Sequence, residues 1–490
     1  MIKEIFSLAS PQWQQRRRAR TLSLFRSAAQ RVPAYKDFLK KYKINPAKIK
    51  SWNDFKQVPL TNKKNYLRQY PMEKLCWDGH LEKPLVFTAT SGSTGAPFYF
   101  PRGEKLDRQA ALMHEIFLRN TLGKNPGPTL IINAFGMGVW IGGLITYKAF
   151  EIFSRENNFP LSIITPGINK NEILNAVKLL APHYSQVIID GYPPFVKDIL
   201  DEAIAQGINI KKLNLRFTFA AETFTEGFRD YMARKANIKN VFRDFFHIYG
   251  SADIGSMAAE MPAGILIKSL ALKDKNVFKS LFGQAEKSPT VAQYVPDFIT
   301  FEGVAGELAL SGNNTIPLIR YALGDKGGVF SYKEAVEKLR GFGVNLESEA
   351  KRAGIGDCMC QLPFVYIYER ADFSTSLYGI IIYPEYIRET LLDKRLEKWL
   401  TGRFTMTTKF DQHQDQYLEV NLELKKNIKS GSVLKHVVLN HLVAGMLKRS
   451  SEFKELVKHV GKRAYPRLIF WPAEDPTYFK LGVKQKWVLK

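Results

Sequence analysis

The chain has 490 residues, of which 45% are hydrophobic, so it can bury a large core in two or three globular units and is not expected to be disordered. Its 71 Lys and Arg residues against 47 Asp and Glu residues give a formal charge of +24, which favours anionic ligands such as nucleotides, nucleic acid or an anionic membrane. Any single basic cluster is more often a solvated surface.

The three cysteines are too few and too badly spaced for a disulfide framework, so a reducing compartment is expected. Cys358 and Cys360 offer two thiolates, but no Cys/His pair is spaced to complete a four-ligand zinc site, and we interpret them as structural. No stretch reaches the roughly 18 apolar residues of a membrane helix, and the N-terminus lacks the long apolar core of a signal peptide. The protein is expected to be soluble and cytoplasmic.

Residues 11–45 mix basic and apolar positions at helical spacing, with Trp13, Leu24 and Phe25 among the apolar ones, until Pro33 interrupts the pattern. This indicates one or two amphipathic helices. Packing on the main domain is the more frequent use of such helices, although a basic face also suits a membrane surface.

From about residue 84, strand-like apolar runs alternate with helical segments, such as the one over residues 105–122, which predicts βαβ units and a partly parallel sheet. The predicted strands are residues 85–90, 129–135, 161–166, 185–193 and 216–222. Open α/β sheets bind their ligands at the ends of such strands. Residues 262–300 and 326–362 show no pattern that we could assign.

The character of the chain changes after Asp372, where short alternating strands (417–424) and amphipathic helices (433–447) occur among many lysines. We therefore predict an α/β protein with a large N-terminal domain over residues 1–371, whose first 80 residues are helical, and a small α+β domain over residues 372–490.

A loop rich in glycine and hydroxyl groups, TSGSTGAP, directly follows the predicted strand 85–90. Glycines let backbone N–H groups approach a phosphate chain, and the hydroxyls add donors, so the loop predicts a phosphate cradle. It lacks the Gly-Lys-Ser/Thr ending of the Walker pattern, and a flexible turn explains the octapeptide alone equally well. The candidate residues are Thr90, Ser91, Gly92, Ser93, Thr94 and Gly95.

TSGSTGAP resembles the phosphate loop of the adenylate-forming superfamily, which includes acyl-CoA ligases, luciferases and the adenylation domains of peptide synthetases. Further phrases of that family recur in the right order. They are Ala220-Ala221-Glu222, Tyr249-Gly250-Ser251-Ala252-Asp253, Arg320-Tyr321-Ala322-Leu323-Gly324-Asp325, Glu369-Arg370-Ala371-Asp372 and, near the end, the tract from Gly482 to Val488. Each match is weak alone. All of them occur in the family's order, and the change in domain character falls at the expected hinge, so chance would rarely produce the whole set.

This resemblance implies a nucleotide site. Tyr249 would stack on adenine, with Ala221, Gly250, Ser251 and Arg370 also binding the nucleotide, and Asp325 would accept hydrogen bonds from both ribose hydroxyls. Asp253, with Glu222 nearby, would hold Mg²⁺, an ion that prefers hard oxygen ligands. Lys484 would be the catalytic lysine of a mobile C-terminal lid that turns about Asp372.

Within the superfamily, residues 31–44, 51–71 and 135–143 resemble the phenylacetate-CoA ligase branch and its capsule-biosynthesis relatives. Aromatic and apolar side chains among small residues suit an apolar acyl pocket. Its expected residues are Phe135, Met137, Trp140 and Tyr192. Core packing would explain a single aromatic residue in this stretch equally well.

Several positions depart from the family pattern. Ala96 stands where many relatives have lysine, and Ala252 and Asp253 replace the usual Thr and Glu, so the triphosphate loses a cation and the metal ligand is shorter by one methylene. Lys486 and Lys490 rival Lys484 as the catalytic lysine. The zinc site of some relatives is not expected, because no cysteine lies between Cys76 and Cys358.

The resemblance implies ATP- and Mg²⁺-dependent adenylation of an aryl or fatty carboxylic acid, followed by acyl transfer to an acceptor thiol or amine, with coenzyme A as the expected acceptor. Two alternatives stay open: an amide- or ester-forming ligase of polysaccharide or secondary-metabolite biosynthesis, and a degenerate, non-catalytic family member. A nucleic-acid partner is not expected, because no recognition module or basic stripe with interleaved aromatics is visible. A homodimer is left open.

Overall fold

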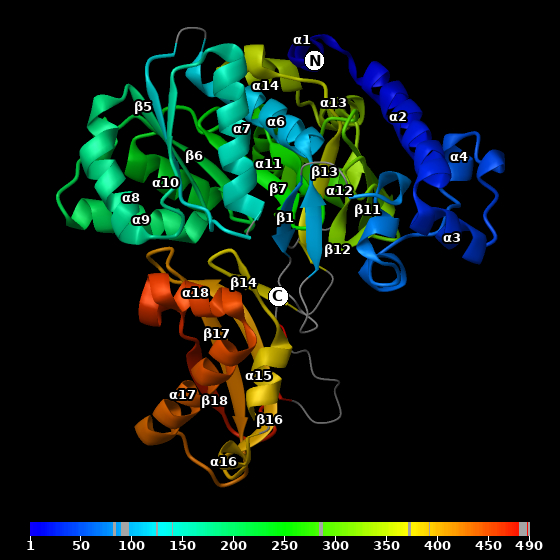
Figure 1. The fold of residues 1–490 in the computed structure, drawn as a ribbon. Helices are drawn as coiled ribbons and strands as arrows, with labels where there is room; N and C mark the ends of the chain where they lie inside the picture. The colour runs from blue at the N-terminus through cyan, green and yellow to red at the C-terminus, as the bar shows by residue number, and fades with distance from the viewer. Residues whose placement is uncertain are drawn as a thin grey trace.

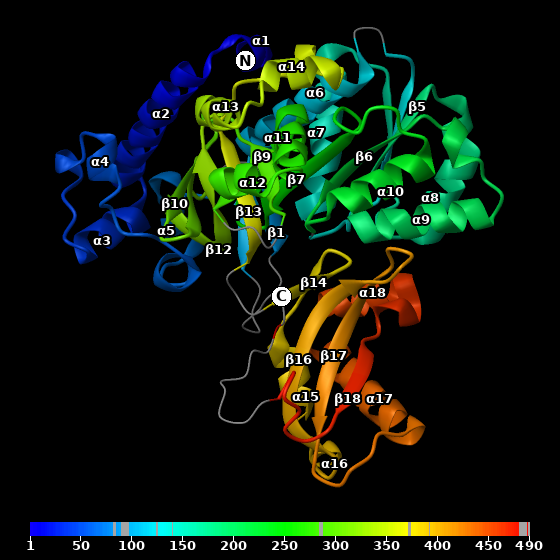
Figure 2. The same cartoon turned by 180° about the vertical axis from the view of Figure 1, so that it is seen from behind.

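A computed structural model of the protein describes residues 1–81, 85–89, 98–123, 126–139, 141–283, 288–370, 374–391 and 393–479 and residue 488, with the side chains of residues 369, 370 and 394 outside the description. The described residues form two lobes, seen from two opposite sides in Figures 1 and 2. We call the described residues up to 370 the large lobe, and those from 374 onward the C-terminal lobe.

The helices of the large lobe are α1 (Ile2–Ser7), α2 (Ser10–Arg31), α3 (Pro33–Lys41), α4 (Trp52–Phe55), α5 (Met72–Leu75), α6 (Glu104–Leu122), α7 (Ile141–Asn157), α8 (Lys170–Asn175), α9 (Pro193–Ala205), α10 (Glu226–Ala236), α11 (Pro262–Ala271), α12 (Lys275–Phe282), α13 (Tyr332–Gly341) and α14 (Leu346–Arg352). Its strands are β1 (Val86–Ala89), β2 (Tyr99–Arg102), β3 (Thr129–Asn133), β4 (Leu161–Ile164), β5 (Gln186–Gly191), β6 (Leu215–Ala220), β7 (Phe245–Ser251), β8 (Gly255–Glu260), β9 (Thr290–Gln293), β10 (Ile299–Val304), β11 (Glu307–Gly312), β12 (Leu318–Phe330) and β13 (Phe364–Arg370).

The C-terminal lobe contains β14 (Thr375–Leu377), β15 (Ile380–Ile382), α15 (Pro384–Leu391), α16 (Lys394–Glu397), β16 (Leu400–Phe410), β17 (Gln416–Leu424), α17 (Ser432–Arg449), α18 (Ser451–Val460) and β18 (Arg467–Trp471). Strands β16, β17 and β18 form one small sheet, and β14 pairs with β15 in a hairpin. This mixture of short strands and helices agrees with the α+β character predicted after Asp372. The predicted boundary itself lies outside the described residues and stays a prediction.

The N-terminal segment, which was predicted to form one or two amphipathic helices, forms α2 and α3. Helix α2 buries its apolar face, including Trp13 and Phe25, against the large lobe. Pro33 begins α3 rather than breaking it, because the first turn of a helix does not need the N–H group that proline lacks. The segment therefore packs on the rest of the large lobe, where Arg16 and Arg17 are half-buried and bond to Asp297 and the Phe301 carbonyl.

Within the described part of the chain, eleven strands form one sheet in the order β10-β11-β12-β13-β9-β8-β7-β6-β5-β3-β4. The neighbours β4, β3, β5, β6 and β7 are parallel, and the remaining pairs are antiparallel. The predicted α/β class with a mixed sheet is thus confirmed.

Helices cover both faces of the parallel part of the sheet. Residues of α8, α9 and α10 pack on one face, and residues of α6 and α7 pack on the other, as Figure 1 shows. Strand β3 is accordingly buried at every residue, the pattern of a strand covered on both sides. The carboxyl ends of β3, β5, β6 and β7 therefore meet at one edge, which faces the C-terminal lobe.

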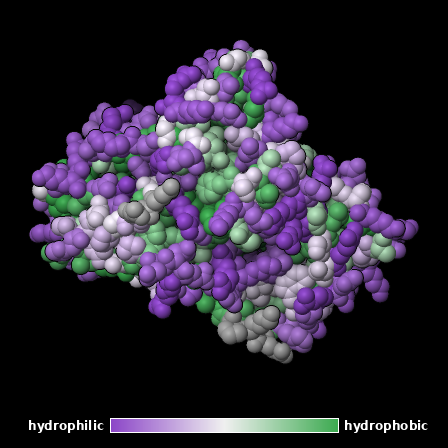
Figure 3. All heavy atoms as spheres, turned by 90° about the horizontal axis from the view of Figure 1, so that it is seen from above, coloured by the Kyte–Doolittle hydropathy of each residue, from purple (hydrophilic) through white to green (hydrophobic). Residues whose placement is uncertain are grey.

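The face of the large lobe seen in Figure 3 is mostly hydrophilic, with hydrophobic residues gathered near its centre. Among the described residues, no helix is long and apolar enough to span a membrane. Cys76, Cys358 and Cys360 are all buried. Burial raises the pKa of both Cys358 and Cys360 to about 12, so neither thiol ionises readily at neutral pH.

Candidate active site

A cleft of about 640 Å³ lies between the strand ends of the large lobe and the C-terminal lobe. Its walls include residues that follow β5, β6 and β7, together with residues of β12, β14, β15 and β16. This is the edge at which open α/β sheets bind ligands. The expected site residues that line the cleft are Phe135, Tyr192, Ala221, Glu222, Tyr249, Gly250, Ser251, Asp253 and Asp325.

The turn after β6 holds an unusual backbone conformation at the cleft. Ala221 has φ 70°, the left-handed region in which a side chain costs about 1 kcal/mol and glycine does not. Alanine therefore holds this turn in a conformation that glycine adopts without strain. Strain of this kind is concentrated at functional sites.

Tyr249 and Asp325, expected to bind adenine and ribose, come from strands that are far apart in the sequence. The Tyr249 hydroxyl donates a hydrogen bond to Asp325 Oδ2, and the Tyr249 ring packs 6.0 Å from the ring of Phe301. Tyr249 stands at the end of β7 and Asp325 lies in β12. The fold thus brings two residues predicted separately into direct contact in one wall of the cleft.

Asp253, the expected metal ligand, is only 8% exposed. Its Oδ1 lies 2.9 Å from Lys63 Nζ, and its Oδ2 accepts a hydrogen bond of 2.6 Å from the Tyr321 hydroxyl. The carboxylate is therefore held in place by an ammonium group and a phenol. Tyr321 belongs to the same phrase as Asp325, so the ribose and metal positions share one strand.

Lys63 is a site residue to which the sequence analysis gave no role. Thr61 extends the edge of β12: its N–H donates to the Arg320 carbonyl over 3.1 Å, and its carbonyl accepts from the Ala322 N–H over 2.8 Å. Asn62 then caps the short helix Lys63–Leu67. These contacts place Lys63 beside Asp253. The only sequence feature that could have drawn attention to Lys63 was the resemblance of residues 51–71 to the family.

Arg102 is a second residue that the sequence analysis missed. It ends β2, and its guanidinium donates to Thr88 Oγ1 over 3.0 Å and to the carbonyls of Ala252 and Asp253. Burial lowers the pKa of Arg102 to about 9, although Asp253 opposes the shift. Arg102 thereby ties the β1–β2 hairpin to the turn that presents Asp253.

Glu222 contacts the C-terminal lobe in this arrangement. Its Oε1 accepts hydrogen bonds from Ser376 Oγ over 2.9 Å and from the Gly379 N–H, and its Oε2 accepts one of 2.7 Å from Gln416 Nε2. Burial raises the pKa of Glu222, and these donors lower it. Both oxygens are used between the lobes, so the metal role expected of Glu222 stays a prediction.

His247 also lines the cleft, and a buried charge network lies behind it. Its Nδ1 is 3.4 Å from Glu260 Oε2. Burial would raise the pKa of Glu260, but the charges of Lys268 and Arg229 hold it well below the ordinary value. Arg229 donates to Glu260 over 2.7 Å. The network fixes the orientation of His247 beside the expected adenine position.

Two of the four residues expected in the acyl pocket, Phe135 and Tyr192, line the cleft, and their role in binding an acyl group stays a prediction. The rings of Phe135 and Tyr192 meet edge to face, with centroids 5.3 Å apart, and Ile141 and Ile145 extend the same apolar wall. Met137 is not among the lining residues; it is half-buried and packs against Gly143 and Gly167. The next residue, Gly138, has φ 81°, a left-handed conformation that favours glycine.

Several expected site residues lie outside the described part of the chain. These are the phosphate-loop residues Thr90, Ser91, Gly92, Ser93, Thr94 and Gly95, the departure Ala96, the pocket residue Trp140, the hinge Asp372, the side chain of Arg370, and Lys484 with its rivals Lys486 and Lys490. Their roles stay predictions. The described flanks of the phosphate loop, β1 and β2, form a hairpin at the cleft, and Ala89 lines it.

Two curated proteins are similar in sequence to this chain, and both are phenylacetate-coenzyme A ligases. The one from Thermus thermophilus is 20% identical over 303 residues, covering 60% of this chain and 61% of its own length. The one from Aromatoleum evansii is 25% identical over 305 residues, covering 61% and 62%. The chain thus spans about three fifths of the length of these relatives. No family model matches it.

Solved structures of a 2-hydroxyisobutyryl-CoA ligase share the fold. The complex with 2-HIB-AMP and CoA in the thioesterification state gives a TM-score of 0.66 at 16% identity, covering 99% of this chain and 91% of that one. The post-adenylation state with R3-HIB-AMP gives 0.55 at 14% identity, with coverage of 100% and 91%. The chain is thus similar in sequence to phenylacetate-coenzyme A ligases and shares its fold with a 2-hydroxyisobutyryl-CoA ligase.

Proposed function

We propose that this protein activates a carboxylic acid as an acyl-AMP, using ATP and Mg²⁺, and then transfers the acyl group to coenzyme A. The observation that carries the proposal is the cleft itself, in which Tyr249, Asp325 and Asp253 lie together at the strand ends. Three separate sequence phrases predicted contacts to the base, the ribose and the metal ion, and the residues of these phrases line one cavity.

The residues of the cleft suit an adenylation site. Asp325 would accept the ribose hydroxyls, and its contact with Tyr249 orients both side chains toward one nucleotide. Asp253 is a buried carboxylate in the wall of the cleft, and its oxygens are the hard ligands that Mg²⁺ prefers, so it would hold the ion together with phosphate oxygens and water. The ion, when bound, would neutralise phosphate charge during nucleotidyl transfer.

Lys63 compensates for a departure of this sequence. Alanine at position 96 removes a cation that many relatives place near the triphosphate. Lys63 Nζ lies 2.9 Å from Asp253, so it supplies positive charge next to the expected metal position from another part of the chain. A compact ammonium with three donors suits phosphate oxygens there.

In the proposed first step, a carboxylate oxygen of the substrate bonds to the α-phosphorus of ATP and pyrophosphate leaves. Lys484 would stabilise the negative charge between the two reactants. In the second step, the thiol sulfur of coenzyme A bonds to the acyl carbon, its proton is lost and AMP leaves. The apolar wall of Phe135, Tyr192 and Ile145 suits an aryl or alkyl acid.

The proposal is tested by measuring pyrophosphate release with ATP and Mg²⁺ over a panel of aryl and alkyl acids, with and without coenzyme A, beside the Lys484→Ala variant. We expect release with one class of acid, an acyl-CoA product by mass spectrometry, and a loss of about a hundredfold in the variant. If hydroxylamine gave an acyl hydroxamate but no acyl-CoA formed, the result would support the adenylation step and refute coenzyme A as the acceptor. No release with any acid, together with no nucleotide binding by calorimetry, would refute the ligase function.

A further inference from the structure

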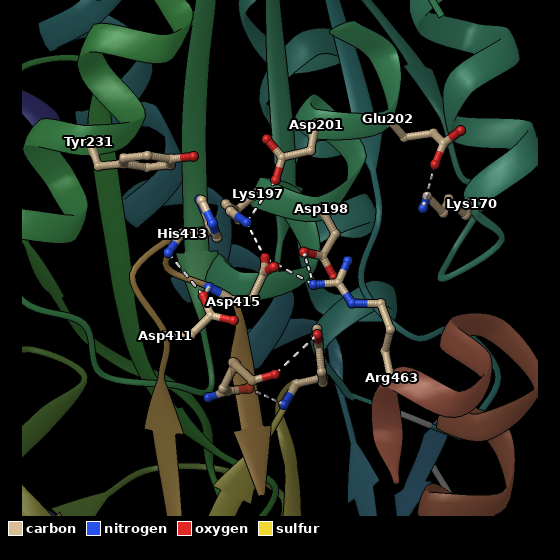
Figure 4. A network of polar contacts seen from close by, with 12 residues as sticks. Lys170, Lys197, Asp198, Asp201, Glu202, Tyr231, Asp411, His413, Asp415 and Arg463 are labelled. Atoms are coloured by element: carbon tan, nitrogen blue, oxygen red, sulfur yellow. Dashed lines mark hydrogen bonds and ion pairs between the residues drawn. The ribbon is translucent and has the colours of Figure 1, made fainter. Parts of the chain in front are cut away.

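A charged network joins the two lobes, as Figure 4 shows. Helix α9 of the large lobe contributes Lys197, Asp198 and Asp201. The C-terminal lobe contributes Asp415, in the turn before β17, and Arg463, in the short helix Gly461–Ala464. All five side chains lie within ion-pair distance of at least one other member.

Ion pairs between the lobes use a cation and a carboxylate from each lobe. Lys197 pairs with Asp415 of the C-terminal lobe and, over 2.7 Å, with Asp201 of its own helix. Arg463 Nη2 lies 3.0 Å from Asp198 Oδ1 and 2.9 Å from Asp415 Oδ1. Each lobe therefore presents both a cation and a carboxylate to the other, so that the network is specific for one relative position of the lobes.

The network is partly removed from solvent, which makes it stronger than a surface ion pair. Lys197 is 1% exposed and Asp198 is 4% exposed. The turn that holds Asp415 is itself rigid, because Asp411 Oδ1 accepts the N–H groups of His413 and Asp415. Breaking one partner of a buried pair leaves an uncompensated charge, which costs more than removing both.

A short chain of contacts connects the network to the cleft. Gln416 follows Asp415 directly, and its Nε2 donates to Glu222 over 2.7 Å. Its Oε1 accepts from the Tyr378 N–H over 2.7 Å, and Gly379 donates to Glu222. The relative position that the network selects is thus the one in which the β14–β15 segment closes on Glu222.

We propose that Lys197, Asp198, Asp415 and Arg463 form an interlobe latch, with Arg463 as a positioning residue that holds the C-terminal lobe over the cleft for acyl transfer. The assignment to acyl transfer rests on the proposed function. It is supported by the higher TM-score against the thioesterification state of the 2-hydroxyisobutyryl-CoA ligase, 0.66, than against its post-adenylation state, 0.55. Scores of one enzyme in two states differ through the placement of its lobes.

The environment of Asp198 predicts different effects for the loss of Asp198 and the loss of Arg463, and this difference can be measured. Burial raises the pKa of Asp198 to about 6, while Arg463 and Lys197 lower it, Asp415 raises it and the Tyr378 hydroxyl lowers it. Ionised Asp198 is thus tolerated only with its cations in place. Removing Arg463 should open the lobes, whereas replacing Asp198 by asparagine should not, and the second change should rescue the first.

The test uses the full chain and the variants Arg463→Ala, Asp198→Asn and the double variant. Lys170→Ala is the matched control, because Lys170 pairs with Glu202 within the large lobe over 3.1 Å and does not cross to the other lobe. Hydrogen exchange of residues 375–383 and small-angle X-ray scattering report the lobe contact without any substrate. We expect Arg463→Ala to speed exchange there about tenfold or more, with none of the other variants faster than the parent protein.

The pH dependence of the same exchange is a second readout. When the lobes part, Asp198 is solvated and its pKa returns toward about 3.9; when they close, it is about 6. The closed arrangement binds the proton more tightly, so it should weaken as pH rises from about 4 to about 6 and stay level above that. Asp198→Asn should remove this dependence.

The activity assays separate the latch from the proposed function. With an accepted acid, Arg463→Ala should keep pyrophosphate release in the first turnover within about twofold and slow acyl transfer about fivefold or more. Unchanged exchange and scattering in Arg463→Ala would refute the latch, whatever the activity. If Arg463→Ala altered the exchange but the parent protein adenylated no acid, the result would support the latch and refute only its assignment to acyl transfer.

Discussion

Lys63 is the residue whose contribution is easiest to isolate, because its neighbour Lys64 is exposed and provides a control of the same charge. Lys63 contacts Asp253 in the cleft. Lys63→Ala should weaken ATP use, raising KM or lowering kcat/KM about ten- to a hundredfold, since a hydrogen bond to a charged group contributes about 1.5–3 kcal/mol. Lys64→Ala should stay close to the parent protein. Equal values in the two variants, measured at fixed Mg²⁺, would contradict the role.

At the residue scale, the predicted positions were those that belong to short phrases: Tyr249, Asp253 and Asp325 all line the cleft. Their partners could not be predicted in the same way. Lys63 and Arg102 reach the Asp253 turn from segments more than 150 residues away, and no local pattern reports such a contact. Met137 shows the converse, because a side chain in a promising stretch does not always line the cavity.

Gly379, between β14 and β15, allows a segment of the C-terminal lobe to approach the large lobe. It has φ 81°, and a Cβ atom there would lie 2.2 Å from the ring of Tyr192. Gly379→Ala should therefore push the hairpin away from the cleft and slow acyl transfer about tenfold or more. Gly402→Ala is the matched control, with φ 83° and nothing within 4 Å.

The two glycine variants should lose similar stability from the strained backbone, so their difference isolates the contact between the lobes. Denaturant unfolding measures the shared cost, and single-turnover acyl transfer measures the difference. If Gly379→Ala transferred the acyl group as fast as Gly402→Ala, the approach of this hairpin to Tyr192 would have no part in the reaction.

At the element scale, strands buried on both faces were predicted well because each is one continuous apolar run bounded by turns. The predicted strand 129–135 is observed as Thr129–Asn133, and the predicted helix 433–447 as Ser432–Arg449. Residues 262–300 and 326–362 contain short helices and strands such as β9, buried at every position. Strand β9 has the sequence TVAQ, and four residues with polar ends are too short to show either a helical or a strand period.

At the scale of the whole molecule, the sequence indicated a smaller C-terminal unit but not its placement. That placement depends on contacts such as Glu222 with Gln416 and Arg463 with Asp198. Each contact joins polar residues whose local sequence gives no sign of a partner in the other lobe. The likeness to known ligases covers the whole fold, whereas the sequence likeness covers about three fifths of the chain.

The central claim is that the acid is activated as an acyl-AMP, and an isotope experiment tests it most directly. The protein, ATP, Mg²⁺ and coenzyme A are incubated with an accepted acid whose carboxylate is labelled with ¹⁸O, and the products are analysed by mass spectrometry. Attack of the carboxylate on the α-phosphorus predicts one ¹⁸O atom in AMP and none in pyrophosphate. Label in inorganic phosphate with formation of ADP, or acyl-CoA formed with unlabelled AMP, would contradict the account.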